Sequence, residues 1–209
     1  MSATTQPTAS QTAHAIAAQA ASLLLRYPDE DASDMLPAVR EALAELPKTL
    51  ARPLQALAAH RCADPVKLSA EYVDLFDTHR RHCLYLSYYT AGDTRNRGTQ
   101  LVEFAMAYRE AGFQPPDGEL PDFLPAVLEL AAQAGEPGWA LLRRYRVGLD
   151  LLAQSLASSP YGQAIVAILA TLPPAAASDL AAAITLARSG PQREQVGLQP
   201  FALPTGGRQ

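Results

Sequence analysis

Apolar residues recur three and four positions apart along most of this chain, in short runs that end at prolines and glycines. The first run includes Ile16, Leu23 and Tyr27 and ends at Pro28. Spacings of three and four place side chains on one face of a helix, whereas a strand that covers a core alternates every second residue. A proline also pushes the residue before it out of helical geometry. The sequence therefore predicts short helices that share one core.

Later segments keep the helical spacing. Asp64 and Pro65 predict a helix start, because aspartate accepts hydrogen bonds from free N–H groups and proline fits the first helical position. Gly112 and Gly135 predict helix ends. The apolar stripe within residues 142–156 is the longest of the chain and has a helical period throughout.

Two further segments complete the pattern. Leu180 and Ile184 indicate a last short helix. The aromatic run at residues 84–89 could be a strand, but the sequence offers no second strand to pair with it, so we assign it to a continued or broken helix. No strand-like alternation and no repeat of fixed period is left. We predict an all-α fold, a single globular bundle of about eight to ten helices.

Composition divides the chain into three parts. Residues 1–11 are rich in serine, threonine and glutamine and carry no charged side chain, which is typical of a flexible tail. Residues 12–189 carry the helical pattern, and residues 190–209 are expected to form a second flexible tail. The chain has 209 residues, 48% of them hydrophobic, which is enough for one sizeable core.

The charge balance argues against nucleic acid and membrane partners. The formal net charge is -4, whereas binding to phosphates needs a concentrated basic face. No apolar run is long enough to span a bilayer, and the N-terminal residues lack the basic start of a signal peptide. Cys62 and Cys83 could form at most one bridge, which favours a reducing compartment. We expect a cytoplasmic protein without direct membrane insertion.

Residues with catalytic or metal-binding potential occur without the partners that such chemistry needs. His79, His82 and Cys83 share the spacing of one helical face, but two arginines separate the histidines and no second ligand pair lies nearby. We therefore interpret them as a polar helix end, and the acidic residues 29–31 as an exposed loop that enters a helix. Phosphate-binding glycine loops and a nucleophile elbow are absent. We expect no enzymatic activity, no metal and no cofactor.

Three motifs in the middle of the chain combine aromatic, acidic and basic side chains. They are residues 72–77 (YVDLFD), 93–100 (DTRNRGTQ) and 119–125 (ELPDFLP). None has the spacing of a catalytic site. A surface that holds another polypeptide is the interpretation we favour, with a solvated acidic face as the alternative for Asp74 and Asp77.

In order and spacing, these motifs resemble the NarJ family, the molybdenum-cofactor assembly chaperones of respiratory nitrate reductase within the TorD-like group. Residues 24–29 (LLRYPD) and 204–207 (PTGG) resemble the family's opening helix and its C-terminal ending. The resemblance implies a TorD/NarJ-like helical fold without catalytic chemistry. It also implies binding of the N-terminal segment of the apo catalytic (alpha) subunit, which is held for insertion of the molybdenum cofactor and an iron–sulfur cluster before membrane docking. Contact with molybdenum-cofactor delivery proteins and nucleotide binding stay open.

The resemblance also suggests where the peptide would bind. An amphipathic helix is held in an apolar groove by a few large side chains, and acidic residues at the rim favour a basic helix. The candidates are Tyr72, Phe76 and Leu124 for the groove or its support, Asp74, Asp77 and Asp122 for the acidic rim, and Arg97 and Gln100 from the middle motif.

Three places depart from the family pattern. Phe123 replaces the histidine of a proline–aspartate–histidine triplet, His79 replaces a glycine, and residues 88–90 (YYT) replace the histidine and glutamate usual before the Asp93 motif. These changes alter the polarity of the expected surface and leave the partner's exact sequence open.

The competing class is an all-α, ligand-responsive transcriptional regulator. Such a protein needs a basic helix-turn-helix, commonly near the N-terminus. Here the first lysine or arginine is Arg26, and acidic residues follow it closely. The sequence therefore favours the chaperone.

Overall fold

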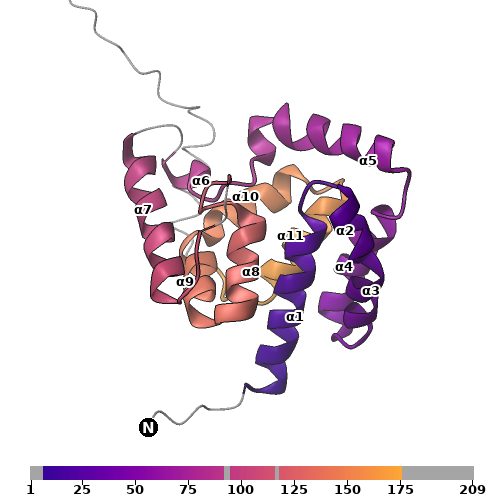
Figure 1. The fold of residues 1–209 in the computed structure, drawn as a ribbon, viewed down its shortest axis with the longest axis horizontal. Helices are drawn as coiled ribbons and strands as arrows, with labels where there is room; N and C mark the ends of the chain where they lie inside the picture. Colours follow the sequence, from indigo (N-terminus) through magenta and orange to yellow (C-terminus); the bar gives the residue numbers. More distant parts are fainter. Residues whose placement is uncertain (1–6, 92–94, 116–117, 176–209) are drawn as a thin grey trace, which may run out of the picture.

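The computed structural model describes residues 7–91, 95–115 and 118–175, and within them the chain is all-α (Figure 1). This confirms the predicted fold class. The first half forms α1 (Ala9–Leu24), α2 (Glu30–Asp34), α3 (Leu36–Ala44), α4 (Lys48–His60) and α5 (Pro65–Tyr72). A π-helical turn η1 (Val73–Asp77) and a 3₁₀ turn η2 (Arg80–His82) follow. The second half forms α6 (Tyr88–Ala91), α7 (Arg95–Glu110), α8 (Leu124–Ala134), α9 (Glu136–Arg144), α10 (Arg146–Ser155) and α11 (Pro160–Leu169).

The ends of the chain only partly meet the expected boundaries. The Thr8 side chain accepts a hydrogen bond from the backbone N–H of Gln11, and the Gln11 side chain accepts one from the N–H of Thr8. This reciprocal cap starts α1 at Ala9, so the boundary expected at residue 11 falls inside a helix. The expected last helix around Leu180 and the second tail lie outside the described residues, as do residues 1–6.

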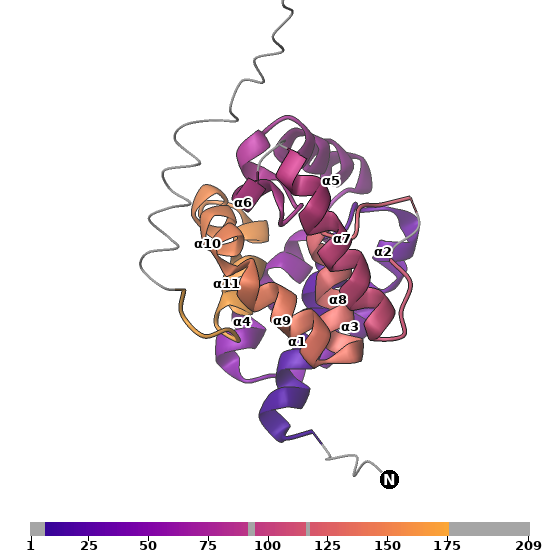
Figure 2. The ribbon, with the colours of Figure 1, turned by 90° about the vertical axis from the view of Figure 1, so that its left-hand side faces the viewer.

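Helix α1 lies at the centre of the bundle and packs against α8 on one side and α3, α4 and α11 on others (Figure 1). Its buried face consists largely of alanines, among them Ala17, Ala18 and Ala21. Small side chains allow neighbouring helix backbones to approach closely, and large side chains from the neighbours then fill the space between them. In the view of Figure 2, α7 lies in front and covers one side of the bundle.

The long apolar stripe is divided between two helices. Leu142 lies in α9 and Leu149 and Leu152 lie in α10, while Tyr145 stands at the junction with its ring 4.6 Å from that of Phe104. All of these side chains are buried. The periodicity identified the core residues correctly, although it did not reveal the break between the helices.

The segment at residues 84–89 differs from the expected helix. The backbone N–H of Leu86 donates to the carbonyl of Asp122 at 3.0 Å, and that of Leu124 donates to the carbonyl of Leu84 at 2.7 Å. Tyr85 and Phe123 thus form an isolated antiparallel bridge, and the helix α6 begins only afterwards. The partner segment is a few residues long and lies next to a proline, so it carries no strand pattern of its own.

The predicted start of α5 is confirmed and gives a simple test. Asp64 Oδ1 accepts hydrogen bonds from the N–H groups of Val66 and Lys67 at 3.0 and 3.2 Å. Asp64→Ala is expected to lower the free energy of unfolding by about 1 kcal/mol, because it leaves both donors without that acceptor. Urea denaturation followed by circular dichroism would measure this loss. The control is Asp34→Ala, an exposed position for which we expect a change within about 0.5 kcal/mol.

Candidate functional site: an aromatic surface at α5 and η1

The first motif forms the end of α5 and the π-helical turn η1, which lie across the top of the molecule in Figure 1. Tyr72 is buried, and its hydroxyl donates to the backbone carbonyl of Leu25 at 3.0 Å. Burial, followed by the neighbouring hydroxyl of Tyr161, raises the pKa of Tyr72 above its ordinary value. The hydroxyl therefore stays protonated and ties the end of α5 to the end of α1.

Four aromatic rings meet at this place, and we call them the aromatic patch: Tyr27, Tyr72, Phe76 and Tyr161. The ring of Tyr72 lies 5.5 Å from Tyr27 and 4.6 Å from Phe76, and Phe76 lies 5.2 Å from Tyr161 at an angle of 90°. Tyr161 is fully buried, Phe76 is half-buried and Tyr27 is 45% exposed. The patch therefore runs from the core to the surface, where Val73 is also exposed.

Acidic side chains lie close in the sequence to Tyr27 and Phe76 of the aromatic patch. Asp74 and Asp77 are exposed on η1, two residues before and one residue after Phe76. The short helix α2 begins three residues after Tyr27 and places Glu30, Asp31 and Asp34 on the surface. Within the described part of the chain, none of these five carboxylates forms an ion pair. Their charge is therefore available to a partner.

Two polar contacts connect the helices that carry the aromatic patch. Arg61 is buried, and its Nη1 donates to the backbone carbonyl of Arg26 at 2.7 Å, which connects the end of α4 to the end of α1. His60 Nε2 lies 2.9 Å from a carboxylate oxygen of Glu71, which connects α4 to α5. These contacts therefore tie together α1, α4 and α5, the three helices that support the aromatic patch.

The second and third motifs meet in a buried polar cluster that we call the clamp: Ser87, Arg97 and Asp122. One carboxylate oxygen of Asp122 accepts from the N–H of Ser87 at 3.1 Å and from its hydroxyl at 2.5 Å. Arg97 Nε donates to the Ser87 hydroxyl oxygen at 3.1 Å, and a terminal nitrogen of its guanidinium lies 3.8 Å from the same carboxylate oxygen. The clamp fastens the first turns of α7 to the residue 84–88 segment and to the start of α8.

The clamp corrects one expected position. Asp122 was placed on the acidic rim, yet its side chain is 0% exposed and it points into the molecule. Leu124 is equally buried and belongs to the core, which leaves it only the supporting role among the two expected for it. Hydrogen bonds to a carboxylate are stronger inside the protein than at its surface, which is why Asp122 can face inward here.

The remaining expected residues lie at the edge of the clamp. Gln100 Oε1 accepts from the Thr90 hydroxyl at 2.8 Å, and Arg97 lies 5.7 Å from the ring centre of Tyr85. Tyr85 in turn donates to Glu119 at 2.6 Å and packs against Phe123 at 5.5 Å. At the position where the family has histidine, Phe123 thus makes an aromatic contact.

The structure therefore separates the candidate residues into two groups. Tyr72, Asp74, Phe76 and Asp77 gather at the aromatic patch, whereas Arg97, Gln100, Asp122 and Leu124 form or border the internal clamp. Sequence reasoning missed Tyr27 and Tyr161 as parts of the patch and Arg61 as a residue that supports it. Tyr27 lies in the LLRYPD segment, whose resemblance to the family's opening helix could have identified it. Nothing in the sequence connects Tyr161 to the first motif.

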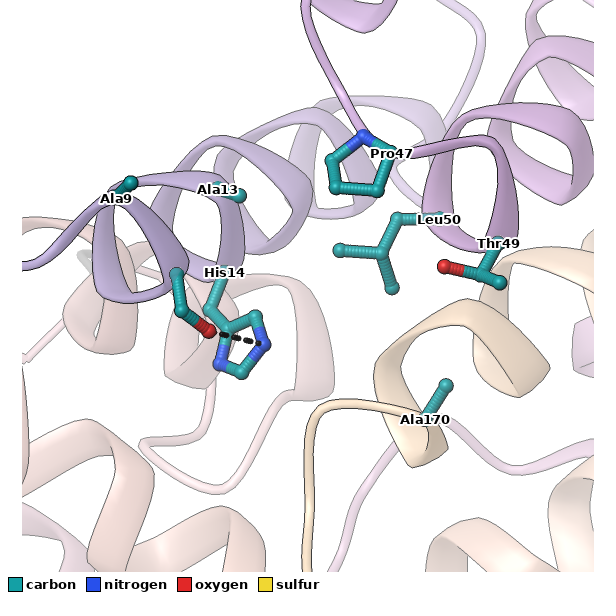
Figure 3. Close-up of a pocket in the computed structure, with 8 residues that line it drawn as sticks. Ala9, Ala13, His14, Pro47, Thr49, Leu50 and Ala170 are labelled. Carbon is teal, nitrogen blue, oxygen red and sulfur yellow. Dashed lines mark hydrogen bonds between the residues drawn. The ribbon is translucent and has the colours of Figure 1, made fainter.

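A cavity of about 470 Å³ lies elsewhere, where the first turns of α1 and α4 meet the end of α11. His14 and Leu50 point into it together with small side chains such as Ala13 and Ala170 (Figure 3). The His14 ring lies 3.5 Å from the hydroxyl of Ser10. None of the expected site residues lines this cavity.

Among the residues that the structure describes, a metal-binding group of three side chains and a membrane-spanning helix are both absent. No three side chains of histidine, cysteine, aspartate or glutamate are grouped so that they could hold a metal ion. None of the helices is both long enough and apolar enough to span a membrane.

Comparison with known proteins identifies the family. Residues 32–156 match the family model described as nitrate reductase delta subunit. The chain belongs to the nitrate reductase delta subunit family. The match runs from within α2 to the end of α10, and it includes the clamp and, of the aromatic patch, Tyr72 and Phe76.

Relatives in this family include named chaperones. The probable nitrate reductase molybdenum cofactor assembly chaperone NarJ of Bacillus subtilis is 32% identical over 158 residues, 73% of this chain and 86% of the relative. NarJ of Escherichia coli, a nitrate reductase molybdenum cofactor assembly chaperone, is 37% identical over 116 residues, 54% of this chain and 49% of the relative.

A longer relative matches the chain over a part of its length. The nitrate reductase-like protein NarX of Mycobacterium tuberculosis is 44% identical over 157 residues, which are 73% of this chain but only 24% of NarX. The chain thus spans about a quarter of the length of that relative.

Proposed function

We propose that this protein is a non-enzymatic assembly chaperone. In this proposal it binds the N-terminal segment of the apo catalytic (alpha) subunit of a nitrate reductase and holds it for insertion of the molybdenum cofactor and an iron–sulfur cluster before membrane docking. The names of the NarJ relatives support the chaperone class. Neither Cys62 nor Cys83 is in a disulfide, which is consistent with action in the cytoplasm.

The observation that carries the proposal is an aromatic patch that reaches the surface among unpaired carboxylates. Tyr27 and Val73 are exposed beside half-buried Phe76. Rings that are anchored in the core lose little conformational entropy when a partner covers them, so they are good contact points. A partner helix with an apolar face would cover these side chains, and its basic residues would meet the carboxylates of η1 and α2.

The direct test is titration calorimetry of the full chain with a peptide that covers the N-terminus of the catalytic subunit. We expect one peptide to bind per chain, and binding should weaken as salt is added because charge contributes to it. Absence of binding between pH 6 and 8 would refute the proposal.

The double variant Phe76→Ala, Asp77→Lys locates the binding surface. It removes one ring of the aromatic patch and reverses one nearby charge, so we expect the dissociation constant to rise about tenfold or more. Helix content should not change, because Asp77 is exposed and Phe76 is only half-buried. Calorimetry measures the affinity and circular dichroism the helix content.

A matched control is available on α7. Met106→Ala, Glu110→Lys makes the same kind of change at two exposed positions that lie apart from the aromatic patch. It should leave the affinity for the peptide unchanged. If the Phe76 and Asp77 variant bound as tightly as this control, the peptide would bind to another surface.

The transcriptional-regulator alternative receives no support from the first helix. Helix α1 contains no lysine or arginine, although a DNA-reading helix needs positive charge. A gel shift with DNA at low salt should accordingly show no complex.

A further inference from the structure

His79 and His82 lie in register on one side of the 3₁₀ turn η2. A 3₁₀ helix has three residues per turn, so side chains three positions apart lie one above the other. The two imidazole rings are stacked accordingly, with their centres 5.2 Å apart and an angle of 28° between their planes. Arg80 and Arg81 occupy the intervening positions, which place them on the other sides of the turn. This differs from the single helical face expected for His79, His82 and Cys83.

The backbone of η1 favours one tautomer of both rings. His79 Nδ1 lies 2.9 Å from the carbonyl oxygen of Asp74, and His82 Nδ1 lies 2.9 Å from that of Leu75. A carbonyl oxygen can only accept a hydrogen bond, so these contacts form when each Nδ1 carries the hydrogen. The Thr78 hydroxyl, 2.7 Å from His79 Nδ1, donates to the same Asp74 carbonyl and so does not compete for this hydrogen. In the neutral rings each Nε2 atom then has a free lone pair. Within the described residues neither Nε2 has a hydrogen-bond partner.

We propose that His79 and His82 form a binding site for one divalent transition-metal cation of the zinc or copper(II) class, which takes the lone pairs of both Nε2 atoms. Metal-binding histidines usually donate their other ring N–H to a carbonyl or carboxylate, which fixes the ring and makes it a better ligand. Both rings already have this second contact. Imidazole suits zinc, copper and nickel, whereas magnesium and calcium prefer oxygen ligands.

The surroundings allow a cation to enter. His79 is exposed and His82 is half-buried, so the site opens to solvent. The exposed carboxylates of Asp74 and Asp77 on η1 offset the charges of Arg80 and Arg81. Because the rings are stacked, their lone pairs lie in neighbouring planes, and the exposed His79 ring has to turn for both to meet one ion, while the His82 ring keeps its contact with the Leu75 carbonyl. With two protein ligands, water completes the coordination.

Calorimetric titration of the full chain with zinc chloride, and electron paramagnetic resonance with copper(II), would test this site. We expect one zinc ion per chain and a copper signal with coupling to two imidazole nitrogens. His79→Ala should raise the dissociation constant more than about tenfold, because even loss of an outer partner of a ligand typically costs about 10–100-fold. His82→Gln should do the same, and circular dichroism would confirm that both variants are folded.

His14→Ala is the matched control, since His14 lies in α1 and its ring contacts Ser10 and Trp139 instead. This variant should bind zinc as the unchanged protein does. The proposal would be overturned if the unchanged protein bound no zinc, or if the His79 and His82 variants bound it as tightly as the control. The copper spectrum decides independently of any variant, because a signal without two imidazole nitrogens contradicts the site. None of these results depends on peptide binding.

Discussion

Asp122→Ala is expected to lower the free energy of unfolding by about 3 kcal/mol. The carboxylate is fully buried, and it accepts hydrogen bonds from the N–H and the hydroxyl of Ser87. Its removal would leave these donors without their acceptor and would also remove the carboxylate that lies 3.8 Å from the guanidinium of Arg97. Chemical denaturation followed by circular dichroism would measure the loss.

Two further variants show whether the clamp causes the effect. Asp74→Ala removes an exposed carboxylate and should change stability by no more than about 0.5 kcal/mol. Asp122→Asn keeps one acceptor for Ser87 and should lose less than the alanine variant. Equal stability of the Asp122→Ala and Asp74→Ala proteins would contradict a structural role for the clamp.

Gly138→Ala is expected to destabilise the protein by about 3 kcal/mol through overpacking between α8 and α9. A Cβ atom at this position would lie 2.2 Å from the backbone nitrogen of Ala131 and 2.4 Å from its Cα. These are backbone atoms of α8 and cannot rotate away, so α9 would have to shift. The higher helix propensity of alanine recovers only about 1 kcal/mol. Thermal and urea denaturation would show the net loss.

Gly98→Ala is the control that changes helix propensity without overpacking. Gly98 also lies in a helix, α7, but a Cβ atom there would meet no other atom within 4 Å. This variant should raise the free energy of unfolding by roughly 0.5–1 kcal/mol. If Gly138→Ala were also stabilising, the close contact of α8 and α9 would not limit this part of the fold.

Local signals in the sequence were reliable wherever a short segment decides its own structure. Asp64 and Pro65 start α5 as predicted, and α8 ends at Gly135, whose φ of 71° suits glycine best. The five-residue helix α2 was missed, because residues 30–34 bury no side chain and so show no apolar period. The segment of residues 84–89, assigned to a continued or broken helix, is helical only from Tyr88, because residues 84–86 pair with residues 122–124, far away in the sequence.

The candidate site was predictable in part. The first motif supplied Tyr72 and Phe76, which do lie together, because residues four apart on a helical turn are neighbours. Their contact with Tyr161 joins residues from opposite halves of the chain, and no periodicity within either segment reveals it. The same limit applies to Asp122. Its place in the sequence suggests an acidic residue at the surface, and only folding brings Ser87 and Arg97 next to it.

The sequence by itself determined the fold class, most helices, the core side chains and the family, because these depend on local spacing and on residue types in order. The tertiary structure alone decided which acidic side chains face solvent. Asp74 and Asp77 are exposed beside the aromatic patch, whereas Asp122 is buried in the clamp. The physical reason is that a carboxylate can be buried only where donors from distant segments surround it, and those donors are brought together by folding.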